Sequence, residues 1–372
     1  MNITDYDIMI VGGGPAGIST WLHLNKFAPD LASRTVIIEK EKHPREKLCG
    51  GALLNPFVNK MFKDVNISPT VPKVDVNSVN ISYAYNGFSF KKKAFLSIIH
   101  RPEFDYFLVN TARQRGAKIL EKETFINLEH KKNDLSVNTS SKNHSVKILV
   151  GADGALSRVR KNISSPYRIS YAATLETFAP VNPDYDNEFE NKSALLDWSC
   201  FNKGIQGYIW HFPCIINNQA YMSHGICDSR INPYIFSGDL KKVFKKENEK
   251  RKLDIPPSTW RSHPVPYFSG RKKLSDARIL LVGDAAGIEP LIGGGIHLSL
   301  LYGDIAARSI VSAFENNDFS LKDYTKKVNK NVVGRYINNS VTMAKKVYSM
   351  EADILETIKE NLNITAKFGR KD

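Results

Sequence analysis

The residues of this sequence that are best suited to chemistry begin with a glycine cluster at positions 12–17, GGGPAG. The cluster follows a short apolar run and precedes an amphipathic stretch, which predicts a strand, a tight turn and a helix. Gly12 would make the turn, Gly14 would let a pyrophosphate approach the backbone, and Gly17 would let the helix pack on the sheet. The start of that helix, at Ala16, offers N–H groups to phosphate oxygens.

A carboxylate follows this turn at the spacing that a bound ribose requires. The next apolar run, residues 35–38, ends at Glu39, which lies 22 residues beyond Gly17. A carboxylate at this place in a strand–turn–helix–strand unit accepts hydrogen bonds from ribose hydroxyls. We therefore predict a dinucleotide-binding unit at the start of the sequence. The rest of the sequence contains no second fingerprint of this kind.

Two later clusters favour a flavin over a nicotinamide as the resident cofactor. Each follows a strand-like apolar run and carries an Asp at the strand end, GADGALSRVR at 151–160 and LVGDAAG at 281–287. The second cluster leads into PLIGGGI at 290–296. Its Asp can hold a ribityl hydroxyl, and the N–H groups of this glycine-rich helix start suit the anionic edge of a reduced flavin. The cofactor contacts predicted from these clusters are Asp153, which is expected to brace the fold and the pyrophosphate side rather than to do chemistry, and Asp284, Gly293, Gly294, Gly295 and Ile296.

The elements that must position these motifs follow from the periodicity of the sequence. Strand-like runs at the two ends of the sequence flank a strand-rich segment between residues 165 and 270, and helical spacing dominates beyond residue 320. We predict an α/β protein, with a Rossmann-type FAD-binding domain, an inserted and mostly antiparallel β-sheet substrate domain, and a C-terminal helical segment. The predicted bounds are 1–165 with 270–320, then 166–269 joined by residues 75–98, and then 321–372.

Composition and charge limit the partners. The 372 residues are 42% hydrophobic and 24% charged, which excludes a disordered chain and a coiled coil. The net charge of +14 favours anionic partners, such as a phosphorylated cofactor or a membrane surface, unless it reflects lysine usage alone. Four cysteines without a CxxC pair exclude a disulfide scaffold and a cysteine-rich zinc site. We expect a cytoplasmic protein without a metal, with peripheral membrane contact left open and no nucleic-acid partner.

Taken together, the motifs resemble FAD-dependent oxidoreductases with the p-hydroxybenzoate hydroxylase fold, over roughly residues 5–315. Three features are similar to the geranylgeranyl reductase family within that group. They are KLCGGAL at 47–53, YIWHFP at 208–213, and Gly287 where aromatic hydroxylases usually have His. The resemblance implies bound FAD, NAD(P)H or another external electron donor, and reduction of carbon–carbon double bonds in the prenyl chains of lipids, chlorophyll precursors or quinones.

The resemblance also implies roles for single residues. Cys49 would lie near the flavin and deliver a proton or tune the ring, although a small residue in a tight turn explains it equally well. His297 is a second proton-donor candidate, against the alternative of a packing histidine. The remaining cofactor contacts implied are Lys47, Gly51 and Arg101, and the substrate wall would be Tyr208, Trp210 and Phe212, whose alternation also suits an ordinary core face.

The sequence departs from the family pattern at two places, and other functions stay open. Cys214 replaces the lysine after Phe-Pro, and a glycine replaces the Glu of Gly-Glu-Gly at 293–295, a loss for which Glu289 could compensate. The alternatives are a flavin monooxygenase acting on a small aromatic, a flavoenzyme that modifies a partner protein side chain, a halogenase, and a non-catalytic basic binder. Three intact cofactor motifs argue against the last of these.

Overall fold

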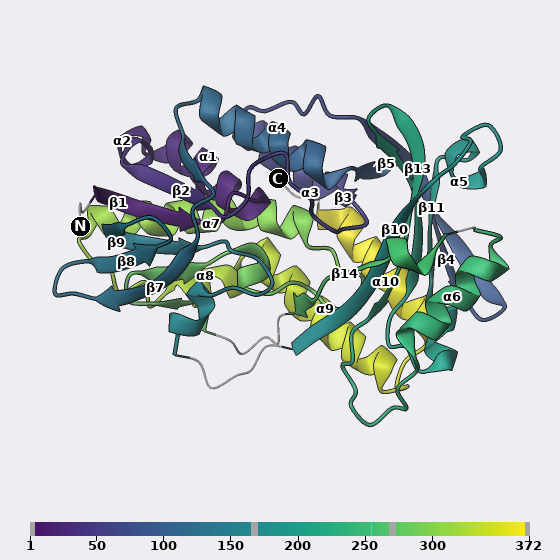
Figure 1. Ribbon diagram of the computed structural model, residues 1–372. Coiled ribbons are helices and arrows are strands. Elements are labelled where there is room, and N and C mark those ends of the chain that lie inside the picture. Colours follow the sequence, from purple (N-terminus) through teal and green to yellow (C-terminus); the bar gives the residue numbers. More distant parts are fainter. Residues whose placement is uncertain (1–3, 165–169, 254, 268–272, 369–372) are drawn as a thin grey trace.

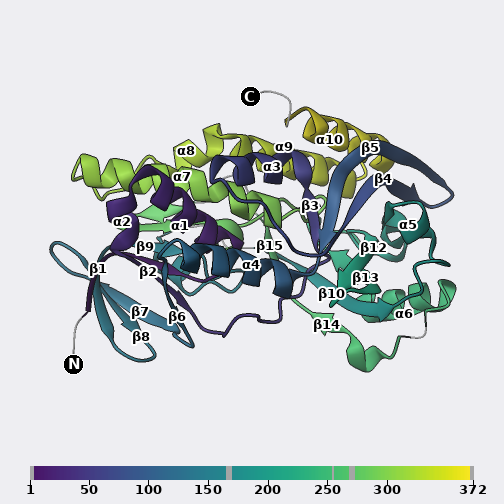
Figure 2. The same ribbon diagram turned by 90° about the horizontal axis from the view of Figure 1, so that it is seen from above.

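The computed structural model describes residues 4–164, 170–253, 255–267 and 273–368 (Figure 1). The predicted boundaries near residues 165 and 270 lie outside these ranges. In Figure 2 two sheets lie at opposite ends of the molecule, with the C-terminal helices along one side. Among the described residues, the first sheet has the strand order β16-β17-β9-β1-β2-β6, with β7 and β8 joined to β9.

The first sheet is built around β1 (Thr4–Val11), which pairs in parallel with β2 (Thr35–Glu39) and β9 (Asn143–Gly151). Ile8, Met9 and Ile10 are fully buried, as expected for a central parallel strand covered on both faces. Its other strands are β6 (Lys118–Glu121), β7 (Phe125–His130), β8 (Leu135–Thr139), β16 (Ser275–Asp276) and β17 (Ile279–Leu281).

Helices α1 (Pro15–Phe27) and α7 (Ile296–Glu315) pack closely against each other beside this sheet. A Cβ at Gly303 would lie 2.3 Å from Oγ of Ser19, so glycine permits the close approach of the two helices. The shorter helices of this part are α2 (Pro29–Ser33), α3 (Asn55–Asp64) and α4 (Arg101–Gln114).

The second sheet has the order β14-β10-β13-β12-β11-β4-β5-β3, with β15 paired to β10. Its strands are antiparallel except for the parallel pair β4–β11. One face packs on α6 (Leu240–Lys250) through Leu175, Ile209, Ile226 and Phe244, and the other faces the interior. The strands are β3 (Ala52–Leu54), β4 (Lys73–Tyr83), β5 (Asn86–Ile99), β10 (Ser170–Pro180), β11 (Ser193–Asp197), β12 (Ile209–Ile216), β13 (Gln219–Asp228), β14 (Arg261–Ser262) and β15 (Val265–Tyr267).

Three helices close the chain: α8 (Tyr324–Lys330), α9 (Val332–Tyr348) and α10 (Ile354–Phe368). Their apolar stripes are buried, with Tyr324, Tyr336 and Tyr348 at 1% exposure or less. Helix α10 contacts α3, β4 and β5, and so ties the C-terminal helices to the second sheet. No helix within the described residues is long and apolar enough to cross a membrane.

Candidate active site

One large cavity, of about 1060 Å³, is lined by residues of both sheets. Every predicted cofactor contact except Gly17 lines it. Gly17 instead supports the turn, because a Cβ there would lie 2.0 Å from the carbonyl oxygen of Gly12. The predicted cofactor contacts in the cavity wall are Gly12, Gly14, Ala16, Glu39, Lys47, Cys49, Gly51, Arg101, Asp153, Asp284, Gly293, Gly294, Gly295 and Ile296.

The turn after β1 has the shape that a dinucleotide requires. Gly12 has a φ of +113°, and a Cβ there would lie 2.2 Å from the carbonyl oxygen of Ala152, so only glycine fits. Gly14 faces a cation, because a Cβ there would lie 3.3 Å from Nη2 of Arg45. The bare backbone at the start of α1 and this guanidinium together suit a pyrophosphate.

Glu39 is held by the same turn. Its Oε2 accepts from the N–H of Gly13 at 2.9 Å, and its Oε1 accepts from the N–H of Glu41 at 3.0 Å. Nε of Arg45 lies 3.6 Å from Oε2. Each carboxylate oxygen retains acceptor capacity for a ribose hydroxyl, so the side chain is both oriented by the protein and able to bind the cofactor.

Arg45, Lys47 and Arg101 form a cation group in the cavity wall, at the start of α4. Arg101 holds Asp105 through two hydrogen bonds of 2.8 Å, and Asp105 also lies 3.3 Å from Nη2 of Arg45. Lys47 donates to Nε2 of His263 at 2.8 Å. Burial lowers the pKa of His263 to about 4, so its imidazole is neutral and accepts this bond. The cation group suits the phosphates of a cofactor.

Asp153 braces the fold, which is the role expected for it. Its Oδ1 accepts from Oγ of Ser157 at 2.5 Å, and its Oδ2 accepts from the N–H groups of Arg158 and Val159 at 2.7 and 3.1 Å. The carboxylate therefore caps the short turn after β9 from inside the molecule.

Glu289 shapes the glycine loop, in a way that the sequence only suggested. Its carboxylate is fully buried and accepts from the N–H groups of Leu291, Ile292 and Gly294 at 2.6–3.2 Å. Burial raises the pKa of Glu289, and these N–H groups act against that shift. The loop thus has a carboxylate bound behind it, and the N–H of Gly294 is already occupied.

The Cys49 loop covers the aromatic wall. A Cβ at Gly50 would lie 3.0 Å from Nε1 of Trp210 and 3.3 Å from the ring of Phe212. Gly51 has a φ of +79°, and a Cβ there would lie 2.0 Å from the carbonyl oxygen of Ile99. Gly51 is therefore required at its position, and Gly50 lets the loop lie close to the two aromatic rings. Sγ of Cys49 accepts from the N–H of Gly51 at 3.4 Å.

The three alternating aromatic residues all line the cavity: Tyr208, just before β12, and Trp210 and Phe212 within it. Tyr208 donates to the carbonyl of Ile292 at 2.5 Å, and Trp210 donates to Oγ of Ser223 at 3.2 Å. Their polar atoms are thus satisfied, which leaves the ring faces as an apolar surface. Val79, Phe95, Leu196 and Leu362 extend this surface.

His297 lies in the first turn of α7 with its ring stacked on Phe57 at 5.3 Å and edge-on to Tyr336 at 6.2 Å. It is 1% exposed, and burial lowers its pKa to about 3. The imidazole is therefore neutral near pH 7 and packed between rings, although it reaches the cavity wall.

Sequence reasoning missed several cavity residues: Arg45, Glu176, His263 and Leu362. Glu176 had a usable signal, because it is an acid at an inward position of the strand-like run 172–179. The others depend on contacts between segments far apart in the chain, which no local pattern shows.

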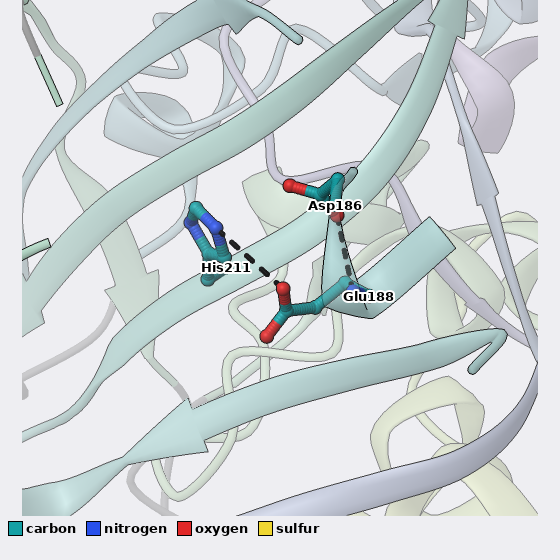
Figure 3. A group of neighbouring side chains, drawn as sticks. All are labelled: Asp186, Glu188 and His211. Carbon is teal, nitrogen blue, oxygen red and sulfur yellow. Dashed lines mark hydrogen bonds and ion pairs between the residues drawn. The ribbon is translucent and has the colours of Figure 1, made fainter. Parts of the chain in front are cut away.

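A polar cluster on the outer face of the second sheet was also missed (Figure 3). His211 Nε2 lies 4.0 Å from Oε2 of Glu188, beside Asp186, whose Oδ1 accepts from the N–H of Glu188 at 3.0 Å. Nδ1 of His224 must donate to the carbonyl of Trp210 at 3.0 Å, so Nδ1 of His211, 3.2 Å away, is the acceptor. The proton of His211 then sits on Nε2, toward Glu188, which favours a polar contact over a metal ligand.

A model of the FAD binding domain family matches residues 5–300. The chain belongs to this family. The digeranylgeranylglycerophospholipid reductase of Methanocaldococcus jannaschii is 27% identical over 96% of this chain and 90% of its own. A geranylgeranyl bacteriochlorophyll reductase-like protein of Thermoplasma acidophilum superposes with a TM-score of 0.76 at 21% identity, covering 93% of this chain and 88% of that one.

The same fold occurs in other flavoproteins. A probable FAD-dependent monooxygenase of Pseudomonas aeruginosa superposes with a TM-score of 0.68 at 12% identity, covering 97% of this chain and all of that one. This FAD-binding protein is an oxidoreductase with geranylgeranyl reductase-like relatives. The glycine turn, Glu39 and the cation group fit its cofactor.

Proposed function

We propose that this protein saturates carbon–carbon double bonds in the chain of a prenyl lipid or prenylquinone. The observation that carries the proposal is a single cavity in which the FAD cradle continues into an aromatic wall of Tyr208, Trp210 and Phe212. A prenyl chain offers almost only apolar surface, and its transfer to such a wall gains about 25 cal/mol per Å². The names of the curated relatives support the same substrate class.

The chain's own residues bind and orient. Gly12, Gly14, Glu39, Arg101 and Asp284 would hold FAD, which supplies a hydride once it is reduced. The aromatic wall would exclude water and hold the alkene beside the Cys49 loop. NAD(P)H or another external donor would visit this site, since the sequence has one dinucleotide fingerprint.

The runner-up is hydroxylation of a small aromatic with O₂, favoured by the similarity to the monooxygenase. Gly287, at the place where aromatic hydroxylases usually have His, and the long apolar wall argue for the reductase instead. Modification of a partner protein side chain is a weaker alternative, because the wall offers an extended apolar surface rather than polar contacts.

One experiment distinguishes these activities. The FAD-loaded protein is reduced without oxygen, by dithionite or NADPH, and is then divided between air and an anaerobic geranylgeranyl lipid or prenylquinone. Reoxidation by the prenyl compound, with a gain of one H₂ per saturated bond by mass spectrometry, is the expected result. Reoxidation by O₂ alone, with release of hydrogen peroxide, would move the monooxygenase to the front.

A further inference from the structure

We propose that the side chain of Glu176 is the acid that delivers the proton to the double bond. This inference rests on the proposed function, because alkene reduction needs a proton as well as a hydride. Neither Cys49 nor His297, the candidates named from the sequence, is as well placed by its surroundings.

Glu176 lies in the middle of β10, between Gly225 on β13 and Arg261 on β14. Its neighbours Leu175 and Thr177 face the outer side of the sheet, where Leu175 packs on α6. Strand alternation therefore turns Glu176 and Thr174 to the inner side, and both line the cavity.

The surroundings of Glu176 leave one oxygen open. The side chain is 3% exposed, and its Oε1 has no hydrogen-bond partner among the described residues. The carboxyl accepts from the N–H of Cys49, which places it against the loop that would cover the flavin. A buried carboxylate oxygen without a partner is costly, so a protonated carboxyl is favoured here.

Burial and the charges around Glu176 together keep its pKa near neutral pH. Burial raises its pKa to about 7, and the N–H of Cys49, Lys47 and Arg101 limit that rise. These groups come from the loop and from α4, while His263 beside Lys47 is neutral. An acid of such a pKa is best matched to proton transfer near neutral pH.

The other two candidates are poorer acids. Burial raises the pKa of Cys49, and the charge of Arg101 only limits that rise. Burial lowers the pKa of His297 to about 3. Its imidazole is therefore neutral at pH 7, and a neutral imidazole is a very weak acid. Glu176 is the cavity residue that combines an available proton with an unpartnered oxygen.

The reaction balances with Glu176 as donor. The hydride that reduced FAD supplies forms a C–H bond at one alkene carbon as the π bond breaks. The O–H bond of Glu176 breaks, and its proton forms the second C–H bond at the adjacent carbon. The carboxylate left behind is stabilised by Lys47, Arg101 and the N–H of Cys49, and it regains a proton from water.

The test compares Glu176→Gln with Glu188→Gln, which alters a partly buried carboxyl on the outer face of the same sheet. In single turnover of the reduced protein with the prenyl substrate, Glu176→Gln should lose on the order of 100-fold or more in rate. Its KM and its reduction by dithionite should match those of the wild type. Glu176→Asp should restore part of the rate, and Glu188→Gln should keep all of it.

A second readout does not depend on turnover. The infrared carbonyl band of a protonated carboxyl should disappear from the FAD-loaded wild type and from Glu188→Gln as pH rises through about 7. Glu176→Gln should lack that transition. A band that titrates below pH 5, or a Glu176→Gln variant that turns over normally, would overturn the role of Glu176. A wild type that saturates no prenyl bond would overturn the proposed function, and this role with it.

Discussion

The indole of Trp210 lies across Gly225, its antiparallel partner on β13, in the space that any side chain there would fill. A Cβ at Gly225 would be 2.1 Å from Cζ2 and 2.4 Å from Cη2 of Trp210. Glu176 follows Gly225 in the same row of the sheet. Because Gly225 has no side chain, the indole of Trp210 has room there, and this part of the aromatic wall lies beside the proposed proton donor.

Gly225→Ala should displace that indole. Overpacking of this kind costs about 1–3 kcal/mol of stability, and KM for the prenyl substrate should rise while FAD stays bound. Trp210→Phe removes the two indole atoms that clash, but the carbonyl oxygen of Leu175, 2.6 Å from such a Cβ, stays in place. The double variant should therefore recover part of the loss. Denaturant unfolding of the four proteins measures the coupling. Additive losses would show that the two residues do not compete for the same space.

Glu289→Ala should destabilise the glycine loop and weaken FAD binding. The change removes the acceptor of one buried N–H group, that of Leu291, and of the partly buried N–H groups of Ile292 and Gly294. A buried N–H group costs about 1–3 kcal/mol when unsatisfied, and the other two cost less because water reaches them. Urea unfolding and FAD retention during dialysis measure the two effects. Glu315→Ala, at the exposed end of α7, is the control and should change neither. Equal stability of the two variants would contradict the assigned hydrogen bonds.

The FAD-binding unit could be predicted from sequence because its signals are local. The glycines at 12–17, Glu39 and Asp284 each belong to a short strand–turn pattern, and all but Gly17 of the predicted contacts line the cavity. Gly17 belongs to the same fingerprint, and its missing side chain lets α1 pack against the turn, which is the role that the fingerprint predicts for it.

The positions of Glu176 and Trp210 side by side depend on strand register, which sequence alone leaves open. Trp210, Gly225 and Glu176 form one row only because β12, β13 and β10 pair as they do. A shift of one residue would turn Glu176 to the outer face. The hydrogen bonds of Glu289 likewise depend on how the loop folds back on itself.

His297→Leu should remove part of the acid sensitivity of the protein. Burial lowers the pKa of His297 from 6.5 to about 3, so between these values the unfolded chain binds a proton that the folded chain does not. The contribution of the neutral His297 to the free energy of unfolding is then fully present above pH 6.5. It falls as pH is lowered, by up to about 1.4 kcal/mol per pH unit.

Urea unfolding at several pH values from 4 to 8 measures the slope for His297→Leu and for the wild type. The variant should lose some stability at pH 7 from the missing ring contacts, yet show a shallower fall below pH 6.5. His211, His224 and His263 have lowered pKa values too, so part of the slope should remain. An unchanged slope would mean that His297 titrates normally in the folded protein.

Cys49→Ala should keep most of the turnover, because Glu176 rather than the thiol supplies the proton. The raised pKa of Cys49 also predicts slow alkylation by iodoacetamide at pH 7. Turnover and FAD content of Cys49→Ala and Cys49→Ser are compared with the wild type. Loss of turnover in both variants with FAD intact would return the proton-donor role to Cys49.

Peripheral membrane contact, left open by the net charge, has a candidate surface, here called the tip, which is formed by the loop between β13 and α6 and by the turn after α9. Tyr234 and Phe236 are 95% and 78% exposed, and the turn after α9 adds Met350 at 77%. Asn232 joins the two segments through a 3.1 Å hydrogen bond to the carbonyl of Tyr348. Exposed lysines are near these side chains in the sequence, Lys241 and Lys242 after the loop and Lys345 and Lys346 before the turn. We propose that this tip docks on an anionic lipid surface.

Sedimentation with vesicles tests that surface. The protein should pellet with phosphatidylglycerol-containing vesicles, less so in high salt, and not with pure phosphatidylcholine. The double change Tyr234→Ser with Phe236→Ser should weaken binding several-fold, since both rings should enter the headgroup region. Tyr85→Ser and Tyr185→Ser alter equally exposed rings elsewhere and should bind as the wild type does. Equal weakening by both pairs would show that binding depends on general surface character rather than on this tip.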